Sequence, residues 1–147
     1  MKVYKVVEKF GGKLHSAITA LHARPWLEED TKWKDWRKWS VTYRKNKVAY
    51  PKVKGSFLFS FRRFKDAKDF VFYNNHQREL AVFKAETVGK IREFPMIATV
   101  SVDNISAFWK TVTLFKCSSQ DPPNGTIGAE GIKLIEEKVC RISTKPK

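Results

Sequence analysis

The residue types that can do chemistry in this chain concentrate in one segment, where cations alternate with aromatic rings. Between Lys32 and Asp69 there are thirteen Lys or Arg and three acids, so the segment's net charge is +10 (thirteen minus three), against +14 for the whole chain. The same segment holds three Trp, two Tyr and four Phe. Cations neutralise phosphates, and aromatic faces stack on bases. The segment therefore favours a nucleic acid as the partner.

Nine cations of this segment are the expected contacts to a phosphate backbone: Arg37, Lys38, Arg44, Lys45, Lys47, Lys52, Lys54, Arg62 and Arg63. Trp36 and Tyr43 are the expected stacking groups, provided that their rings are exposed. Burial in the core is the alternative explanation for the aromatic residues. For the cations the alternative is an ordinary solvated face.

Local patterns place several of these cations at a turn and at a helix start. Arg44–Lys47 is a polar run between two short segments that favour strands. From Phe61 to Tyr73 the apolar residues recur at helical spacing, with Ser60 as the expected N-cap. Ser60–Arg63 would then form a phosphate-binding corner at the positive end of that helix.

β-branched and aromatic runs predict that strands make up most of the remaining chain. We expect strands at 3–9, 13–20, 40–43, 48–50, 56–60, 80–88, 91–94, 96–102 and 113–117. A turn at Gly89-Lys90 and a short helix after Asp103 are also expected. Gly125–Gly131 should be a mobile loop, and 132–142 is a strand or a helix. We predict one α+β domain over 1–147, with a mainly antiparallel, twisted sheet and two or three short helices.

Composition bounds the class of protein. With 42% hydrophobic residues, five Trp and eleven Phe, the 147 residues can build a packed core. The sequence pI near 9.9 favours a polyanionic partner: a nucleic acid, an anionic membrane surface or an acidic protein. No signal-like apolar run and no stretch of transmembrane length is present. We therefore expect a cytoplasmic protein without a transmembrane segment, with reduced thiols at Cys117 and Cys140.

Motifs of catalysis and of metal binding are missing from the sequence. There is no Gly-x-Ser-x-Gly, and the glycine-rich run lacks the Gly-Lys-Ser/Thr of a phosphate-binding loop. His15, His22 and His76 lack the close spacing to the cysteines that a zinc site requires. We therefore assign no catalytic residue, no metal ligand and no cofactor, and the sequence favours a protein that is not an enzyme.

One part of the chain resembles the ADP-ribosyltransferase fold. Gly55–Ser60, Ala67–Phe70 and Leu80–Ala85 are similar to its strand ending in Ser or Thr, its helix with an inward Ala, and the strand that follows. The resemblance implies an enzyme acting on NAD, or a remnant of one. Such an enzyme needs an Arg or His on the first strand, where this chain departs from the pattern with Lys5. It also needs a late glutamate, for which the candidates are Glu130 and Glu136.

A second resemblance concerns the opening Tyr4-Lys5-Val6-Val7, with the later Phe-x-Phe and Phe-x-x-Ala-x-x-Phe elements. These are similar to small uncharacterised phage and archaeal-virus proteins, which implies a location in the host cytoplasm. The residues as a whole favour a basic protein that binds DNA or RNA with low sequence specificity. An ADP-ribosyltransferase-like enzyme and a binder of an acidic host or virion protein are the alternatives.

Overall fold

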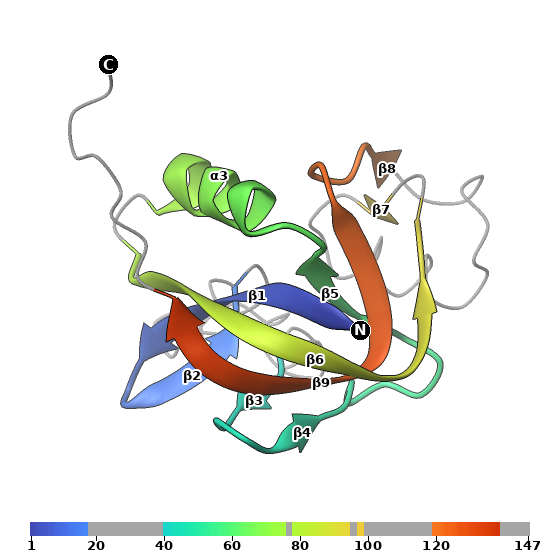
Figure 1. Ribbon diagram of the computed structural model, residues 1–147, viewed down its shortest axis with the longest axis horizontal. Coiled ribbons are helices and arrows are strands. Elements are labelled where there is room, and N and C mark those ends of the chain that lie inside the picture. Colours follow the sequence, from blue (N-terminus) through green and yellow to red (C-terminus); the bar gives the residue numbers. More distant parts are fainter. Residues whose placement is uncertain (18–39, 76–77, 95–96, 99–118, 139–147) are drawn as a thin grey trace, which may run out of the picture.

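The structure is a computed structural model that describes residues 1–17, 40–75, 78–94, 97–98 and 119–138. Within these residues a strongly curved, seven-stranded antiparallel sheet carries one helix on its outside (Figure 1). The strands of this sheet are β1 (Lys2–Phe10), β2 (Lys13–Ser16), β3 (Thr42–Tyr43), β4 (Val48–Ala49), β5 (Leu58–Phe61), β6 (Leu80–Arg92) and β9 (Thr126–Lys138). The helix is α3 (Phe64–Asn74), and β7 (Ile97–Ala98) with β8 (Ser119–Gln120) forms a separate small sheet.

Strand pairing closes the larger sheet into a small barrel. β6 lies between β1 and β9 and pairs with both along most of its length. On their other edges β1 and β9 both pair with β5, so the path from β1 through β6, β9 and β5 returns to β1. β2 and β3 continue the sheet beyond β1, and β4 continues it beyond β9. The four closing strands therefore enclose a common interior.

Alternation along each strand gives the barrel an inner and an outer face. On β1, Val3, Lys5 and Val7 are buried on the inner side, where Val3 and Val7 join a core built from all the larger strands. The outer sides of β1 and β6 contribute to a second cluster, which α3 covers with Ala67 and Val71. Helix α3 is thus held to the barrel by its apolar face, as the helical spacing predicts.

Much of the predicted architecture is confirmed. The fold is a mainly antiparallel sheet, and it opens with the expected hairpin of β1 and β2 around Gly11-Gly12. A tight turn lies at Asn46, whose φ is 64°, and α3 ends at Asn74 with Asn75 as its C-cap. The part of the chain that the structure describes contains one helix, and it has no helix long and apolar enough to cross a membrane. The helix expected after Asp103 and the strand at 113–117 lie outside the described residues.

The expected start of the helix is wrong by three residues. Ser60 does not cap α3; it lies on β5 opposite Ile127 of β9, and its side chain is buried. Because β5 pairs with β9 up to Phe61, the extended conformation continues past the point where the helical pattern begins. Arg63 is the N-cap, with extended backbone angles and no capping hydrogen bond from its side chain.

Two glycine-containing segments that were expected to be a turn and a mobile loop are strands. Gly89 has φ of 77° and sits at an irregularity of β6, which continues to Arg92 while still pairing with β9. A left-handed residue at a bulge bends a strand without ending it. Gly125 alone lies in a turn, and 126–131 begin β9, in which Gly128 and Gly131 are buried against neighbouring side chains.

Candidate nucleic-acid interface

The fold divides the basic segment between two sides of the barrel. In Figure 1 the β3–β4 turn lies below the barrel and α3 lies above it. Arg62 and Arg63 enter α3 and so lie on the upper side. We call the lower surface the loop face; it comprises the β3–β4 turn, β4 and the loop to β5, with the cations Arg44, Lys45, Lys47, Lys52 and Lys54. Trp36, Arg37 and Lys38 lie outside the described residues.

The β3–β4 turn is anchored to β9 by its backbone. The amide of Asn46 donates a hydrogen bond to the carbonyl of Leu134 in β9 (2.7 Å). Within the turn, the amide of Lys47 donates to the carbonyl of Arg44 (3.1 Å). With these bonds made inside, the side chains of Arg44, Lys45 and Lys47 extend into solvent, and all three residues are exposed. No acid of the described residues forms an ion pair with any of these three side chains. Their positive charges are therefore available to a ligand.

The arginines at the entrance to α3 are in the opposite situation. Arg62 pairs with Glu93 at 2.5 Å between Nη2 and Oε1. Arg63 binds both carboxylate oxygens of the buried Asp66, at 2.8 Å and 3.2 Å. A phosphate would have to compete with these carboxylates. The corner at Ser60–Arg63 consequently offers less net positive charge than the sequence suggests.

Tyr43 cannot stack on a base in this structure, which corrects its assignment as a stacking group. Its side chain faces the barrel interior and is 2% exposed, with the Lys5 ammonium 5.3 Å from the ring centroid. Burial raises the pKa of the Tyr43 hydroxyl well above its usual range, an effect that the Ser16 side chain partly offsets. The pairing of Leu14 with Tyr43 fixes which way β3 faces, and the sequence of β3 alone does not reveal this.

Tyr50 is the exposed aromatic residue of the loop face, and the sequence reasoning did not select it. Its side chain is 59% exposed, directly after β4 and between Lys47 and Lys52 in the chain. One edge of its ring lies over Gly131 of β9. The signal that was available is the proline that follows: Pro51 ends the strand, so Tyr50 stands at a strand end rather than within the sheet.

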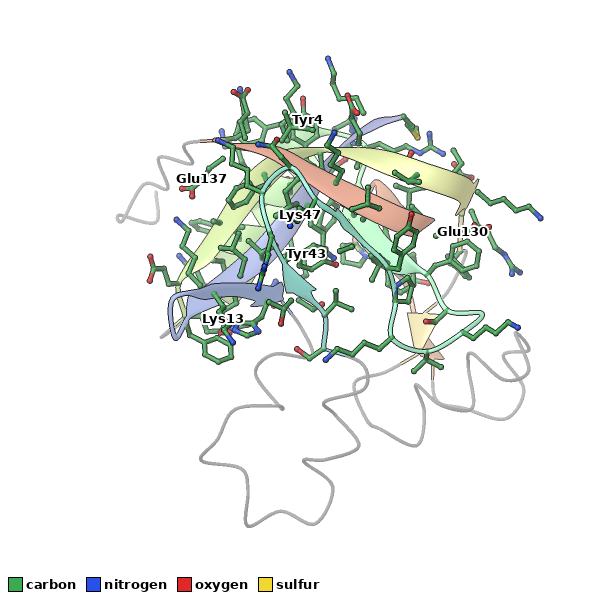
Figure 2. All side chains as sticks on the ribbon, turned by 90° about the horizontal axis from the view of Figure 1, so that it is seen from below. Tyr4, Lys13, Tyr43, Lys47, Glu130 and Glu137 are labelled. Atoms are coloured by element: carbon green, nitrogen blue, oxygen red, sulfur yellow. The ribbon has the colours of Figure 1, made fainter. Side chains whose placement is uncertain are left out.

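β2 brings a further cation to the same side of the molecule. Lys13, in the hairpin that precedes the basic segment, is exposed and lies two residues from His15. The ring of His15 is stacked on that of Phe10, with the ring centroids 3.9 Å apart. Burial lowers the pKa of His15. A backbone hydrogen bond at Phe10 raises this pKa, and the charges of Lys13 and Lys52 lower it. Figure 2 shows Lys13 and Lys47 in the view from below, with Glu130 and Glu137 towards opposite sides.

Of the residues that an ADP-ribosyltransferase-like site would need, Lys5 and Ser60 are buried on paired strands, but neither candidate glutamate lies with them. Lys5 donates from Nζ to the carbonyl of Phe59 (2.5 Å) inside the barrel, and burial lowers its pKa to about 8. Ser60 is also buried. Glu130 lies against Gly89 at the bulge of β6, and Glu136 is exposed. Within the described residues no cluster of three or more His, Cys, Asp or Glu is arranged to hold a metal ion.

No protein-family model matches the chain, and searches of curated proteins and of solved structures find no significant similarity.

Proposed function

We propose that this chain is a basic, non-enzymatic protein that binds nucleic acid through its loop face, in the cytoplasm and with low sequence specificity. The observation that carries the proposal is the set of exposed cations in the β3–β4 turn, Arg44, Lys45 and Lys47, which form no ion pair with a described acid. Lys13, Lys52 and Lys54 extend this positive surface. Phosphates are the polyanionic groups that such a surface attracts in every sequence of DNA or RNA.

Low sequence specificity follows from the kind of side chain on this surface. Phosphate contacts from Lys and Arg fix position on the backbone but carry no base information. The one described helix is separate from the loop face. Its N-cap Arg63 and its Lys65 are paired with Asp66 and Asp69, and Lys68 lies over the Phe64 ring. It is therefore a poor candidate for a recognition helix in a groove.

The test is the salt dependence of oligonucleotide binding by two charge-matched triple variants. The loop-face variant replaces Arg44, Lys45 and Lys47 with Ala. The control variant replaces Arg62, Lys65 and Lys68, on the α3 side, with Ala. With four to six cations engaged, the wild-type slope of log K against log salt should be roughly −3 to −5, from about −0.7 to −0.9 per phosphate. The loop-face variant should bind all sequences more weakly and show a slope smaller in magnitude by roughly two to three.

The control carries the same change in net charge, so it measures any general effect of charge. We expect its slope to stay near the wild-type value. Equal losses in the two variants would mean that net charge, and not the loop face, attracts the nucleic acid. If the wild type binds no oligonucleotide at low salt, the proposed function is wrong.

A second candidate, binding of an acidic protein, is favoured by a different surface. Phe72 and Tyr73 of α3 are 43% and 80% exposed, and their rings meet edge to face at 5.1 Å. Lys65 and Lys68 are exposed on the same helix. Polyglutamate binding would test this candidate. If the candidate is right, replacing Phe72 and Tyr73 with Ser abolishes polyglutamate binding, and the loop-face variant binds polyglutamate as tightly as the wild type.

A further inference from the structure

The ring of Tyr50 is exposed to solvent and also rests against a neighbouring strand. A Cβ atom on Gly131 would lie 3.0 Å from Cε1 and 3.2 Å from Cδ1 of Tyr50, so the ring edge rests on bare backbone of β9. The Val48 side chain lies on the same glycine, at 3.1 Å from that Cβ position. The ring is thus supported on one side, while 59% of the residue remains in contact with solvent.

The backbone around Tyr50 is held on both sides. Val48 and Ala49 pair with Lys133 and Ile132 of β9, and Pro51 restricts the chain immediately after Tyr50. An aromatic side chain whose position is set before binding loses little conformational freedom when a ligand stacks on it. Tyr50 is therefore prepared to receive a flat partner.

We infer that Tyr50 is a stacking platform for an unpaired base, and that the loop face consequently prefers single-stranded nucleic acid. The inference rests on the proposed function and names the class of ligand. Lys47 and Lys52 are exposed and lie three residues before and two residues after Tyr50 in the chain, so this segment offers cations for the phosphates on either side of a stacked nucleotide. Grooves that hold single strands combine cations that follow the backbone with aromatic rings that stack on the bases.

A duplex cannot use this platform in the same way. Its bases are stacked on one another inside the helix, and only its phosphates and groove edges reach a protruding ring. Duplex binding would therefore use the cations of the loop face alone. The ring of Tyr50 should add affinity only for single strands, whether of DNA or of RNA, because every base has an aromatic face.

The experiment measures Kd for matched single-stranded and duplex oligonucleotides, with DNA and RNA in separate arms. The variants are Tyr50→Ala, Tyr50→Phe and the control Tyr73→Ala, which removes an exposed tyrosine of α3. Tyr50→Ala should weaken single-strand binding roughly 5- to 150-fold and leave duplex binding unchanged. Tyr50→Phe and Tyr73→Ala should bind like the wild type, because the first keeps the ring and the second lies away from the loop face.

A second readout locates the base directly. Single strands carrying 5-iodouracil should form a photochemical crosslink to the peptide containing Tyr50, and the Tyr50→Ala variant should lose it. Unchanged single-strand affinity in Tyr50→Ala would overturn the inference while leaving duplex binding, its salt slope and the proposed function intact. Equal weakening of single strands and duplex would also overturn it, since a lost stacking contact affects only the former. Absence of all binding by the wild type would instead remove the proposed function itself.

Discussion

Lys5 lies on the inner face of β1, where its amine is buried and donates to the carbonyl of Phe59. A buried ammonium loses hydration, so burial lowers the pKa of Lys5 from 10.5 to about 8. The unfolded chain keeps the ordinary value. Between these two values the unfolded chain binds a proton that the folded protein has released, so stability rises with pH in that window.

We predict that the free energy of unfolding increases by about 2 kcal/mol between pH 7 and pH 10, from the linkage of this single group. Above pH 10 it should fall again, because the folded state keeps the Tyr43 proton that the unfolded chain loses. Urea unfolding of the wild type at intervals of one pH unit measures this rise. Lys5→Met should remove the rise, and Lys45→Met, at an exposed lysine, should retain it.

If Lys5→Met shows the same increase as the wild type, the Lys5 amine is charged in the folded protein throughout this range. The alternation of β1 places Lys5 on the core face with Val3 and Val7, but the residue type argues against burial, because lysines are rarely fully buried and the other lysines of the described residues are mostly exposed. The same limit explains the two tyrosines. Tyr43 and Tyr50 have similarly basic neighbours, and only the pairing of β3 with β2 and of β4 with β9 makes one buried and the other exposed.

Among the elements, β9 differs most from its expected form. Its glycines suggest a mobile loop, but side chains from other segments of the chain fill the space above them. A Cβ on Gly128 would lie 2.7 Å from Phe94 Cε2 and 3.1 Å from Phe57 Cβ. These rings pack edge to face, with centroids 5.8 Å apart. Gly128 is therefore a packing residue of a strand.

We predict that Gly128→Ala lowers the free energy of unfolding by about 1 to 3 kcal/mol, the usual range for overpacking a filled site. Thermal or urea unfolding would measure the loss. Part of it should be recovered when Phe94→Leu is added, because the smaller side chain makes room for the methyl group. Strictly additive losses in the double variant would show that Phe94 does not limit the space at Gly128.

Elements with a strong local pattern were predictable, and those set by distant partners were not. The alternation from Phe57 to Phe61 and the helical spacing of Ala67 and Val71 predict β5 and α3 correctly in type. The boundary at Ser60 was missed because pairing with β9, more than sixty residues later in the chain, extends β5 by one residue. The bulge at Gly89 was likewise unpredictable, since a left-handed glycine is equally typical of a hairpin turn.

At the scale of the molecule, closure of the barrel determines which cations act together. In the sequence the basic segment is continuous, and Arg62 and Arg63 belong with Arg44 and Lys45. Closure through β5 and β9 puts the first pair beside α3 and the second pair on the opposite side. The same folding places Lys13 of β2 on the side of the loop face (Figure 2). The kind of site could thus be predicted from charge, but which residues form it depends on long-range strand pairing.

The central claim, that the loop face and not the α3 side holds the nucleic acid, is tested most directly by NMR chemical shifts. At 17.1 kDa the protein suits amide mapping during titration with a single-stranded oligonucleotide at low salt. We predict that the amides whose chemical shifts change cluster at 13–15, 44–54 and 131–133. The amide chemical shifts of α3, residues 64–74, should not change. The largest shifts within α3, or no shift at 44–54 in the saturated complex, would contradict the account.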